Sequence, residues 1–302
     1  MSKAVPVLTV ALQKSNGFLG TRLAAFLTAN AAFELVPAEP QSNLPIDVLL
    51  LNGWGSVPSS SAGQPLAEIA LSVTPLLHFL AGFSNAVPKH VVFFSSAGAV
   101  YANKNVGSCA GELSETAALS PNSAYGAGKI AAEAFLRAES IRLGFALTIL
   151  RITNVYGPGQ AIRAGFGIIP AIYQAMAAGS AMSLWPSSRQ PRDYLFIDDF
   201  LSALSALLSA PAPRAAIQVF NLGSGSNASV PELMAIAEAL VQNLFAQNVC
   251  EASVGAAQLR DAEIALPSAA AFQQTFNWRA QITLEAGIAK TFEYLANHQR
   301  IR

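Results

Sequence analysis

The chain has 302 residues, enough for one large domain or two smaller ones with a sizeable hydrophobic core. Apolar residues make up 52% of it and charged residues 12%, which indicates a globular protein and excludes a disordered one. Lysine plus arginine and aspartate plus glutamate number 18 each, so no basic excess favours nucleic acid or a membrane surface as a partner.

The two cysteines, Cys109 and Cys250, are too few for a disulfide framework. The three histidines, His78, His90 and His298, show no metal-ligand spacing. The N-terminal segment lacks the pattern of a signal peptide, and no run of about 18–20 apolar residues would span a membrane. We therefore expect a soluble cytoplasmic protein without a bound metal.

Short apolar runs alternate with longer segments of helical spacing through the first two thirds of the chain, as in parallel strands joined by crossover helices. The strands are predicted at Pro6–Leu12, Phe33–Ala38, Asp47–Asn52, His90–Ser95, Ala146–Ile152 and Ala216–Leu222. The helices between them are predicted at Phe18–Thr28, Pro65–Phe83, Ala124–Leu143 and Asp198–Leu208. This pattern predicts an α/β fold, a doubly wound parallel Rossmann-type sheet.

The pattern changes after residue 156, where glycine- and proline-rich loops accompany helices predicted at Ile168–Ala178, Val230–Asn248 and Thr283–Asn297. We expect residues 1–156 and 193–223 to form the Rossmann domain. Residues 157–192 and 224–302 are predicted to form a smaller, mostly helical lobe. A lobe over the carboxyl ends of the strands would create a ligand-binding cleft.

A glycine turn follows the first predicted strand and comprises Gly17, Phe18, Leu19 and Gly20. In dinucleotide-binding folds such glycines let the backbone approach a pyrophosphate, whose charge lies at a helix N-terminus. Lys14 stands where a first turn glycine would be expected. By itself, this motif is more often an ordinary turn than a nucleotide site.

Tyr125 and Lys129 are one helical turn apart and share a helix face. A nearby ammonium favours the phenolate and so suits a tyrosine to proton transfer. Ser95 and Ser96 end a preceding predicted strand, at the sheet edge where a substrate hydroxyl would be polarised. Taken alone, the tyrosine and lysine would more often be a solvated helix face, and the serines an ordinary loop cap.

Six motifs in order make the chain resemble the extended short-chain dehydrogenase/reductases of the NAD-dependent epimerase/dehydratase family, and within it the UDP-sugar 4-epimerases. They lie at residues 17–20, 95–101, 125–129, 151–158, 192–199 and 221–225. The resemblance covers nearly the whole chain. It implies an enzyme in which NAD carries out the redox chemistry at C4 of a nucleotide sugar.

The resemblance also assigns roles to residues. Tyr125 would be the general base and acid, Lys129 would hold the nicotinamide ribose, and Ser96 would bind the sugar hydroxyl. NAD would contact the glycine turn together with Glu39, Asn52, Gly53, Ser95, Tyr125 and Lys129. The nucleotide sugar, expected to be UDP-linked, would contact Asn154, Trp185, Arg192, Arg260 and Asp261. Asp198 and Asp199 are predicted to cap the helix that follows them.

The chain departs from the family pattern in its cofactor half. Only a short segment separates Glu39 from Asp47, so a helix and a strand usual in the family are missing. Ala97 occupies the position where many relatives carry the catalytic serine or threonine, and Ala97-Gly98 argues against a dehydratase.

Two alternatives therefore stay open. One is an NADPH-dependent reductase of the same fold, favoured by Lys14 or Arg22, and the other is a non-catalytic nucleotide-sugar binding protein whose cofactor site has decayed. A homodimer is expected, because relatives pair two helices per subunit and the segments 65–83 and 124–143 are rich in alanine and leucine.

Overall fold

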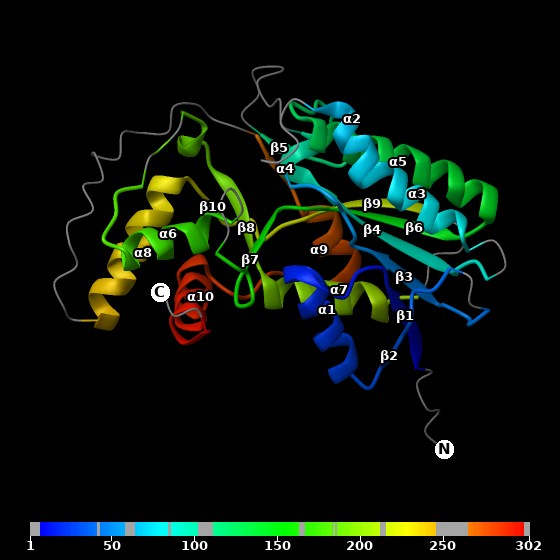
Figure 1. The fold of residues 1–302 in the computed structure, drawn as a ribbon, viewed down its shortest axis with the longest axis horizontal. Coiled ribbons are helices and arrows are strands. Elements are labelled where there is room, and N and C mark those ends of the chain that lie inside the picture. The colour runs from blue at the N-terminus through cyan, green and yellow to red at the C-terminus, as the bar shows by residue number, and fades with distance from the viewer. Residues whose placement is uncertain are drawn as a thin grey trace.

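The computed structural model describes residues 7–40, 43–57, 64–83, 86–101, 111–162, 167–182, 184, 186–211, 216–245 and 265–298. Its centre is a six-stranded parallel sheet (Figure 1). In spatial order its strands are β2 (Phe33–Val36), β1 (Leu8–Leu12), β3 (Val48–Leu51), β4 (His90–Ser96), β6 (Ala146–Ile152) and β9 (Ile217–Leu222). All six strands overlap the predicted ones, and the predicted Rossmann-type fold is confirmed.

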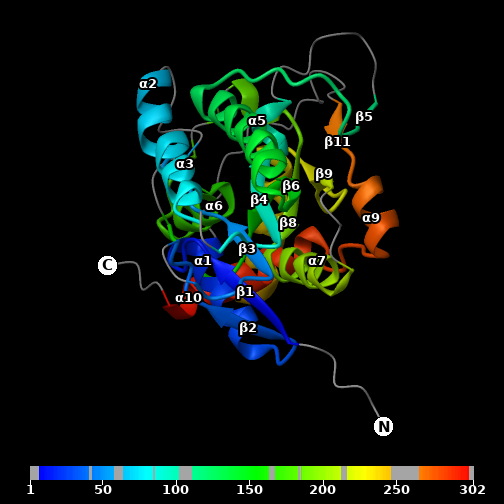
Figure 2. The ribbon, with the colours of Figure 1, turned by 90° about the vertical axis from the view of Figure 1, so that its right-hand side faces the viewer.

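Helices cover both faces of this sheet, which explains why its strands are almost continuously apolar. One face packs against α1 (Gly17–Ala29) and α7 (Ile197–Ser209), and the other against α3 (Thr74–Ala81) and α5 (Ala124–Leu143). Figure 2 shows these layers from the side. Alternate residues of one strand enter different cores: in β3, Leu50 packs toward α1 and Leu49 toward α3.

The connection from β2 to β3 is short. Strand β2 ends at Val36, before Pro37, because proline cannot donate a ladder hydrogen bond. Between the two strands, the described residues 37–40 and 43–47 form neither helix nor strand. The chain nevertheless crosses from one side of β1 to the other, so β1 and β3 flank the point where the strand order reverses. In open α/β sheets, ligands bind at the carboxyl ends of the strands at this point.

The predicted helix over 65–83 is interrupted by a wide turn. It runs as α2 (Pro65–Glu68), a π-helical segment η1 (Ile69–Val73) and α3. Pro75 has no N–H to donate to the carbonyl of Leu71, so regular α-helical bonding fails there. A side chain at Gly55 would collide with this Leu71 carbonyl, so glycine is required where the loop after β3 meets the helix.

Beside the central sheet, a three-stranded sheet packs with helices, and two of its strands come from residues 154–156 and 192–196, most of which were predicted to belong to the Rossmann domain. The strands of this second sheet are β10 (Asn227–Ala228), β8 (Arg192–Phe196) and β7 (Asn154–Tyr156), and α6 (Ile168–Ala177), α8 (Val230–Phe245) and α10 (Leu284–His298) pack together beside them. The short elements are α4 (Ala97–Val100), β5 (Glu112–Leu113), η2 (Pro186–Arg189), β11 (Leu266–Pro267) and α9 (Ala270–Phe276). Within the described segments, no helix is both long enough and apolar enough to cross a membrane.

Candidate active site

The loops after β1 and β3 are hydrogen-bonded to each other. The side-chain amide of Asn52 accepts from the backbone N–H of Lys14 at 3.0 Å and donates to the Lys14 carbonyl at 2.7 Å. The backbone N–H of Gly53 donates to the side-chain oxygen of Gln13 at 2.9 Å. Asn52 and Gly53, predicted to contact the cofactor, therefore hold the loop that leads into the glycine turn.

The glycine turn leaves the N-terminus of α1 open. Gly17 has φ of +74°, in the left-handed region that favours glycine, and a side chain at Gly20 would collide with the Lys14 carbonyl. Asn16 at the N-cap makes no side-chain cap, and the first turn of α1 carries no acidic residue. Phe18 and Leu19 pack partly into the core below. Uncapped N–H groups at a helix N-terminus fit a phosphate group.

Tyr125 and Ser96 meet where α5 begins. The Ser123 hydroxyl caps α5 by accepting from the backbone N–H of Gly126 at 3.2 Å. A Cβ at Gly126 would lie 2.6 Å from the Ala99 carbonyl, so glycine lets α5 approach α4 closely. Burial raises the pKa of Tyr125 to about 12, and a hydrogen bond with the Ser96 side chain opposes that rise.

The ammonium of Lys129 is buried, with 5% of the residue exposed. Its Nζ donates to the Phe94 carbonyl at 2.8 Å and lies 3.9 Å from the centre of the Trp54 ring, a cation–π contact. Burial lowers the pKa of Lys129 to about 7, although the negative charges of Glu68 and Glu133 act to raise this pKa. The lysine predicted to hold a ribose is thus covered by an indole.

Sequence reasoning missed Trp54 and Glu68. The Trp54 indole N–H donates to Glu68 Oε1 at 2.9 Å, and the Trp54 and Tyr125 rings lie 6.3 Å apart, edge to face. The signals were present, since Trp54 follows the predicted cofactor residues 52 and 53, and Glu68 is a single acid within an apolar segment.

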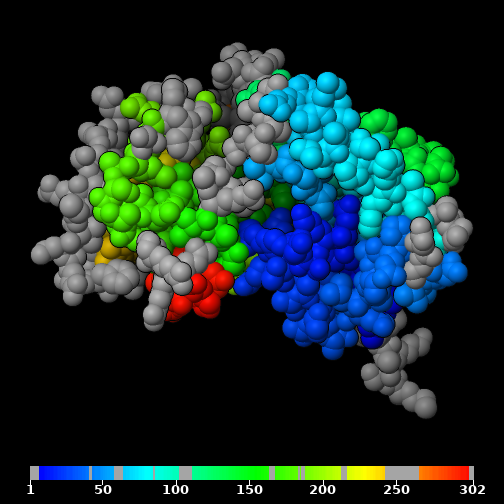
Figure 3. Space-filling model, viewed as in Figure 1, coloured from blue at the N-terminus to red at the C-terminus, as the bar shows by residue number. Residues whose placement is uncertain are grey.

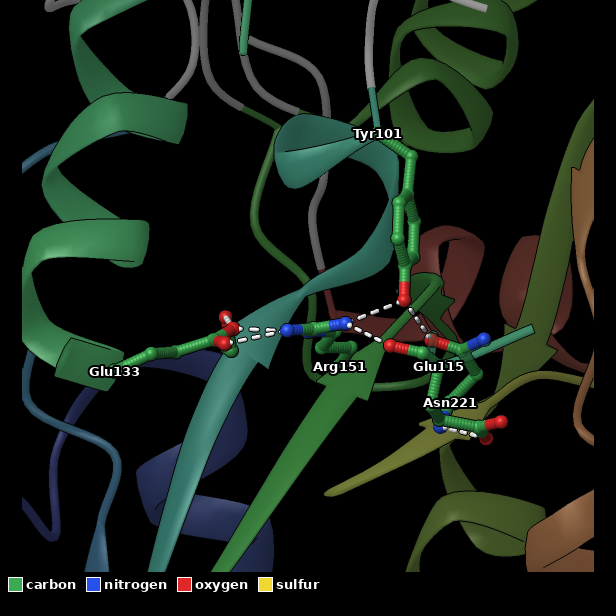
Figure 4. A network of polar contacts seen from close by, with 6 residues as sticks. Tyr101, Glu115, Glu133, Arg151 and Asn221 are labelled. Atoms are coloured by element: carbon green, nitrogen blue, oxygen red, sulfur yellow. Dashed lines mark hydrogen bonds and ion pairs between the residues drawn. The ribbon is translucent and has the colours of Figure 1, made fainter. Parts of the chain in front are cut away.

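A buried polar network centres on Arg151 and includes Glu133, Tyr101 and Asn221 (Figure 4). The Arg151 guanidinium makes a bidentate ion pair with Glu133, with Nε at 3.0 Å and Nη2 at 2.7 Å from the carboxylate oxygens. It also donates to the Tyr101 hydroxyl, which in turn donates to Asn221. Ser95 Oγ donates to Glu133 at 2.6 Å, so the proton of this hydroxyl is already engaged within the network.

Asn154 and Arg192 lie on the neighbouring strands β7 and β8. The Asn154 amide donates to the Asp193 carbonyl at 2.8 Å, whereas Arg192 is exposed. The carboxylate of Asp193 is buried and accepts from Thr153 Oγ1 and from the backbone N–H groups of residues 224 and 225. Asp193 therefore anchors β8, on which Arg192 lies, to the neighbouring loops.

Of the remaining predicted site residues, only Glu39 is among those that the structure describes. Glu39 is exposed, three residues beyond the end of β2. Trp185, Arg260 and Asp261, like Cys109 and Cys250, lie outside the described residues.

The prediction that Asp198 and Asp199 cap the next helix is wrong. Phe196 is the N-cap of α7, which has no side-chain cap. Asp198 instead pairs with Arg22 at 2.6 Å, and Asp199 accepts from the backbone N–H groups of Gln281 and Ile282. A longer-range partner is available to each carboxylate, so both tie α7 to distant segments.

The chain is similar in sequence and in fold to known nucleotide-sugar epimerases. The chain is 28% identical over 237 residues to a UDP-glucose 4-epimerase of Mycolicibacterium smegmatis, covering 78% of this chain and 72% of the relative. It shares its fold with a UDP-glucose 4-epimerase of Thermotoga maritima solved with UDP-glucose, at a TM-score of 0.76 and 19% identity, covering 97% of this chain and 100% of the other. MoeE5, solved with UDP-glucose and NAD, gives a TM-score of 0.74 at 24% identity over 96% and 99% of the two chains.

Residues 41–223 match the NAD dependent epimerase/dehydratase family, which is more than half of the chain. As its motifs indicate, this protein belongs to that family of enzymes.

Proposed function

We propose that the protein is an NAD-dependent nucleotide-sugar 4-epimerase, acting on a UDP-hexose by transient oxidation at C4. The observation that carries the proposal is that Tyr125 is hydrogen-bonded with Ser96 and has Lys129 Nζ 5.7 Å from the centre of its ring. The Mycolicibacterium relative, named a UDP-glucose 4-epimerase, supports the choice of substrate.

NAD, when bound, would accept the hydride from C4 and return it to the opposite face of the sugar. Tyr125 removes the proton of the C4 hydroxyl and later returns it, while Ser96 holds the same hydroxyl. With a pKa of about 12, Tyr125 carries its proton near pH 7. It acts as a base only when positive charge at the site lowers that pKa, and Lys129 supplies one such charge.

Asn154 and Arg192 are proposed to hold the diphosphate of the substrate. The exposed guanidinium of Arg192 is planar and can bind two phosphate oxygens in a bidentate manner. The diphosphate anchors the nucleotide while the oxidised sugar turns over. Figure 3 shows a hollow in the surface between α1, in blue, and α2, in cyan, which opens toward the part of the chain in green.

The protein is also proposed to form a homodimer through the outer face of α2, η1 and α5. This face exposes Leu66, Ile69, Leu71, Phe135 and Ile141, with Leu66 82% and Ile141 78% exposed. Helices α2 and α5 pack side by side. Pairing with a second copy would remove these apolar side chains from water.

The test is to denature the purified protein and quantify the released NAD, NADH and their phosphorylated forms, then titrate each by calorimetry if none is released. An epimerase that recycles its cofactor in place is expected to release about one NAD per chain. Binding of NADPH alone would indicate a reductase. Failure to bind any dinucleotide would contradict the catalytic proposal and indicate a nucleotide-sugar binding protein.

A further inference from the structure

Glu68 is buried where its helix surface exposes hydrophobic residues. Only 2% of Glu68 is exposed, while its neighbours Leu66 and Ile69 are 82% and 49% exposed. Burying a carboxylate is costly, and a buried acid beside exposed aliphatic residues inverts the usual pattern. The residue therefore calls for an explanation beyond helix stability.

The backbone of α5 makes room for this carboxylate next to Lys129. A Cβ at Gly128 would lie 2.7 Å from Glu68 Cγ and 2.9 Å from Glu68 Oε1. The absence of a side chain at position 128 lets Glu68 lie against α5 one residue before the catalytic lysine. Any larger residue there would displace the acid.

One indole joins Glu68 to both catalytic residues. The Trp54 N–H holds Glu68 Oε1 at 2.9 Å, the face of the same ring covers Lys129 Nζ at 3.9 Å, and its edge meets the Tyr125 ring. The other carboxylate oxygen, Oε2, is buried and has no hydrogen-bond partner within the described structure. Among the described residues, the carboxylate charge of Glu68 is therefore stabilised by a single hydrogen bond.

Two carboxylates act on Lys129, but they differ in their own partners. Glu133 is neutralised by its bidentate pair with Arg151. Among the described residues, Glu68 has no ion pair of its own. Its charge also disfavours the phenolate of Tyr125, so its favourable effect is on the lysine.

We propose that Glu68 is a positioning residue of the active site, which, held by the Trp54 indole, keeps the buried Lys129 ammonium charged beside Tyr125. This inference rests on the proposed function only for its catalytic meaning. The state of Lys129 can be measured in the protein without substrate or cofactor.

The chain has six lysines, so protein labelled with ¹³C at the lysine ε carbon gives a sparse spectrum in which a Lys129→Arg variant identifies the Lys129 signal. In the wild type, we expect this signal to titrate near pH 7. Glu68→Gln keeps the shape and removes the charge, and is expected to lower the midpoint by roughly one pH unit. Glu139→Gln, a partly exposed acid farther along α5, is expected to leave it unchanged.

Two further variants separate charge from structure. Glu68→Asp keeps the charge and is expected to stay closer to the wild type than to Glu68→Gln. Trp54→Phe keeps a ring over Lys129 but frees the carboxylate, and is expected to lower the midpoint by less than Glu68→Gln does; it carries the test if Glu68→Gln does not fold. A Lys129 midpoint that Glu68→Gln leaves unchanged, or that Glu139→Gln moves equally, would overturn the proposal.

In turnover assays, Glu68→Gln is expected to lose activity at a lower pH than the wild type as pH rises, because Lys129 loses its proton earlier. If no turnover is found for any variant while the Lys129 midpoint shifts as expected, the proposed function fails and the role of Glu68 in the site stands.

Discussion

Gly20 and the carbonyl of Lys14 are in such close contact that no side chain fits between them. This contact holds the first turn of α1 against the loop that leads into it. The loop is in turn fixed to β3 through Asn52. The geometry of the proposed pyrophosphate site thus depends on the absence of a side chain at Gly20.

Gly20→Ala is therefore expected to displace the loop and weaken NAD binding. A Cβ would meet backbone atoms, which cannot move aside as a flexible side chain does. Calorimetric titration with NAD measures the loss. Thr21→Ala, one residue along on the exposed side of α1, serves as the control, and equal affinities for the two variants would contradict the prediction.

Tyr125→Phe is expected to lower turnover by roughly 10³-fold while leaving nucleotide-sugar binding intact, because it removes only the hydroxyl that transfers the proton. Epimerisation of UDP-glucose followed by chromatography, together with calorimetry, separates the two effects. A binding protein would be indifferent to this change. Loss of binding together with activity would mean that the hydroxyl has a structural role.

Arg151→Met is expected to destabilise the protein by about 3–5 kcal/mol, because it leaves Glu133 buried and unpaired. Urea unfolding measures the change. Arg142→Met is the matched comparison, because it breaks an arginine–glutamate pair, with Glu139, at the protein surface. It is expected to have little effect. Similar losses for both variants would contradict the importance of burial.

His90 is expected to make stability sensitive to acid. Burial lowers its pKa from 6.5 to about 4, and its Nε2 lies 2.8 Å from Thr148 Oγ1. Since the unfolded chain takes up the proton first, the free energy of unfolding falls as pH falls from 6.5 to 4, by up to about 3 kcal/mol. Urea unfolding across this range is expected to show the loss in the wild type and in His78→Gln, but not in His90→Gln.

The proposed dimer makes a prediction about mass. Light scattering is expected to give about twice the 31.5 kDa of one chain. Leu66→Lys with Ile141→Lys places charges on the proposed interface and is expected to give monomers, whereas Leu184→Lys, exposed in the smaller lobe, is not. A monomeric wild type would contradict the dimer.

The sheet could be predicted well because its strands are short, mainly apolar runs bounded by turn residues, and β3, β4 and β6 are buried over nearly their whole length. Helix α5 was predicted with the bounds it has in the structure, from Ala124 to the residue before Gly144, which ends it with φ of +78°. The break at η1 was missed, since helical spacing continues through Pro75 and only the lost hydrogen bond to Leu71 reveals the π-helical turn.

The family motifs selected Tyr125, Ser96 and Lys129, which the structure brings together, whereas the contacts around them were not predicted. Tyr125 and Lys129 were found by their spacing, but nothing in that spacing shows that the ammonium would be covered by Trp54. The partners of Asp199 lie more than eighty residues away along the chain. Local rules for helix capping therefore assigned this carboxylate to the wrong neighbour.

The position of β2 at the edge of the sheet affects where the protein begins to unfold locally. Within the described residues, β2 is bonded to β1 alone and forms one edge of the sheet, while β1 is bonded on both sides. Local unfolding begins where few bonds hold a segment, so β2 and the end of α1 will detach before the centre of the sheet does. A dinucleotide bound at the N-terminus of α1 would oppose this fraying, and occupancy of the site and rigidity of this edge would rise together.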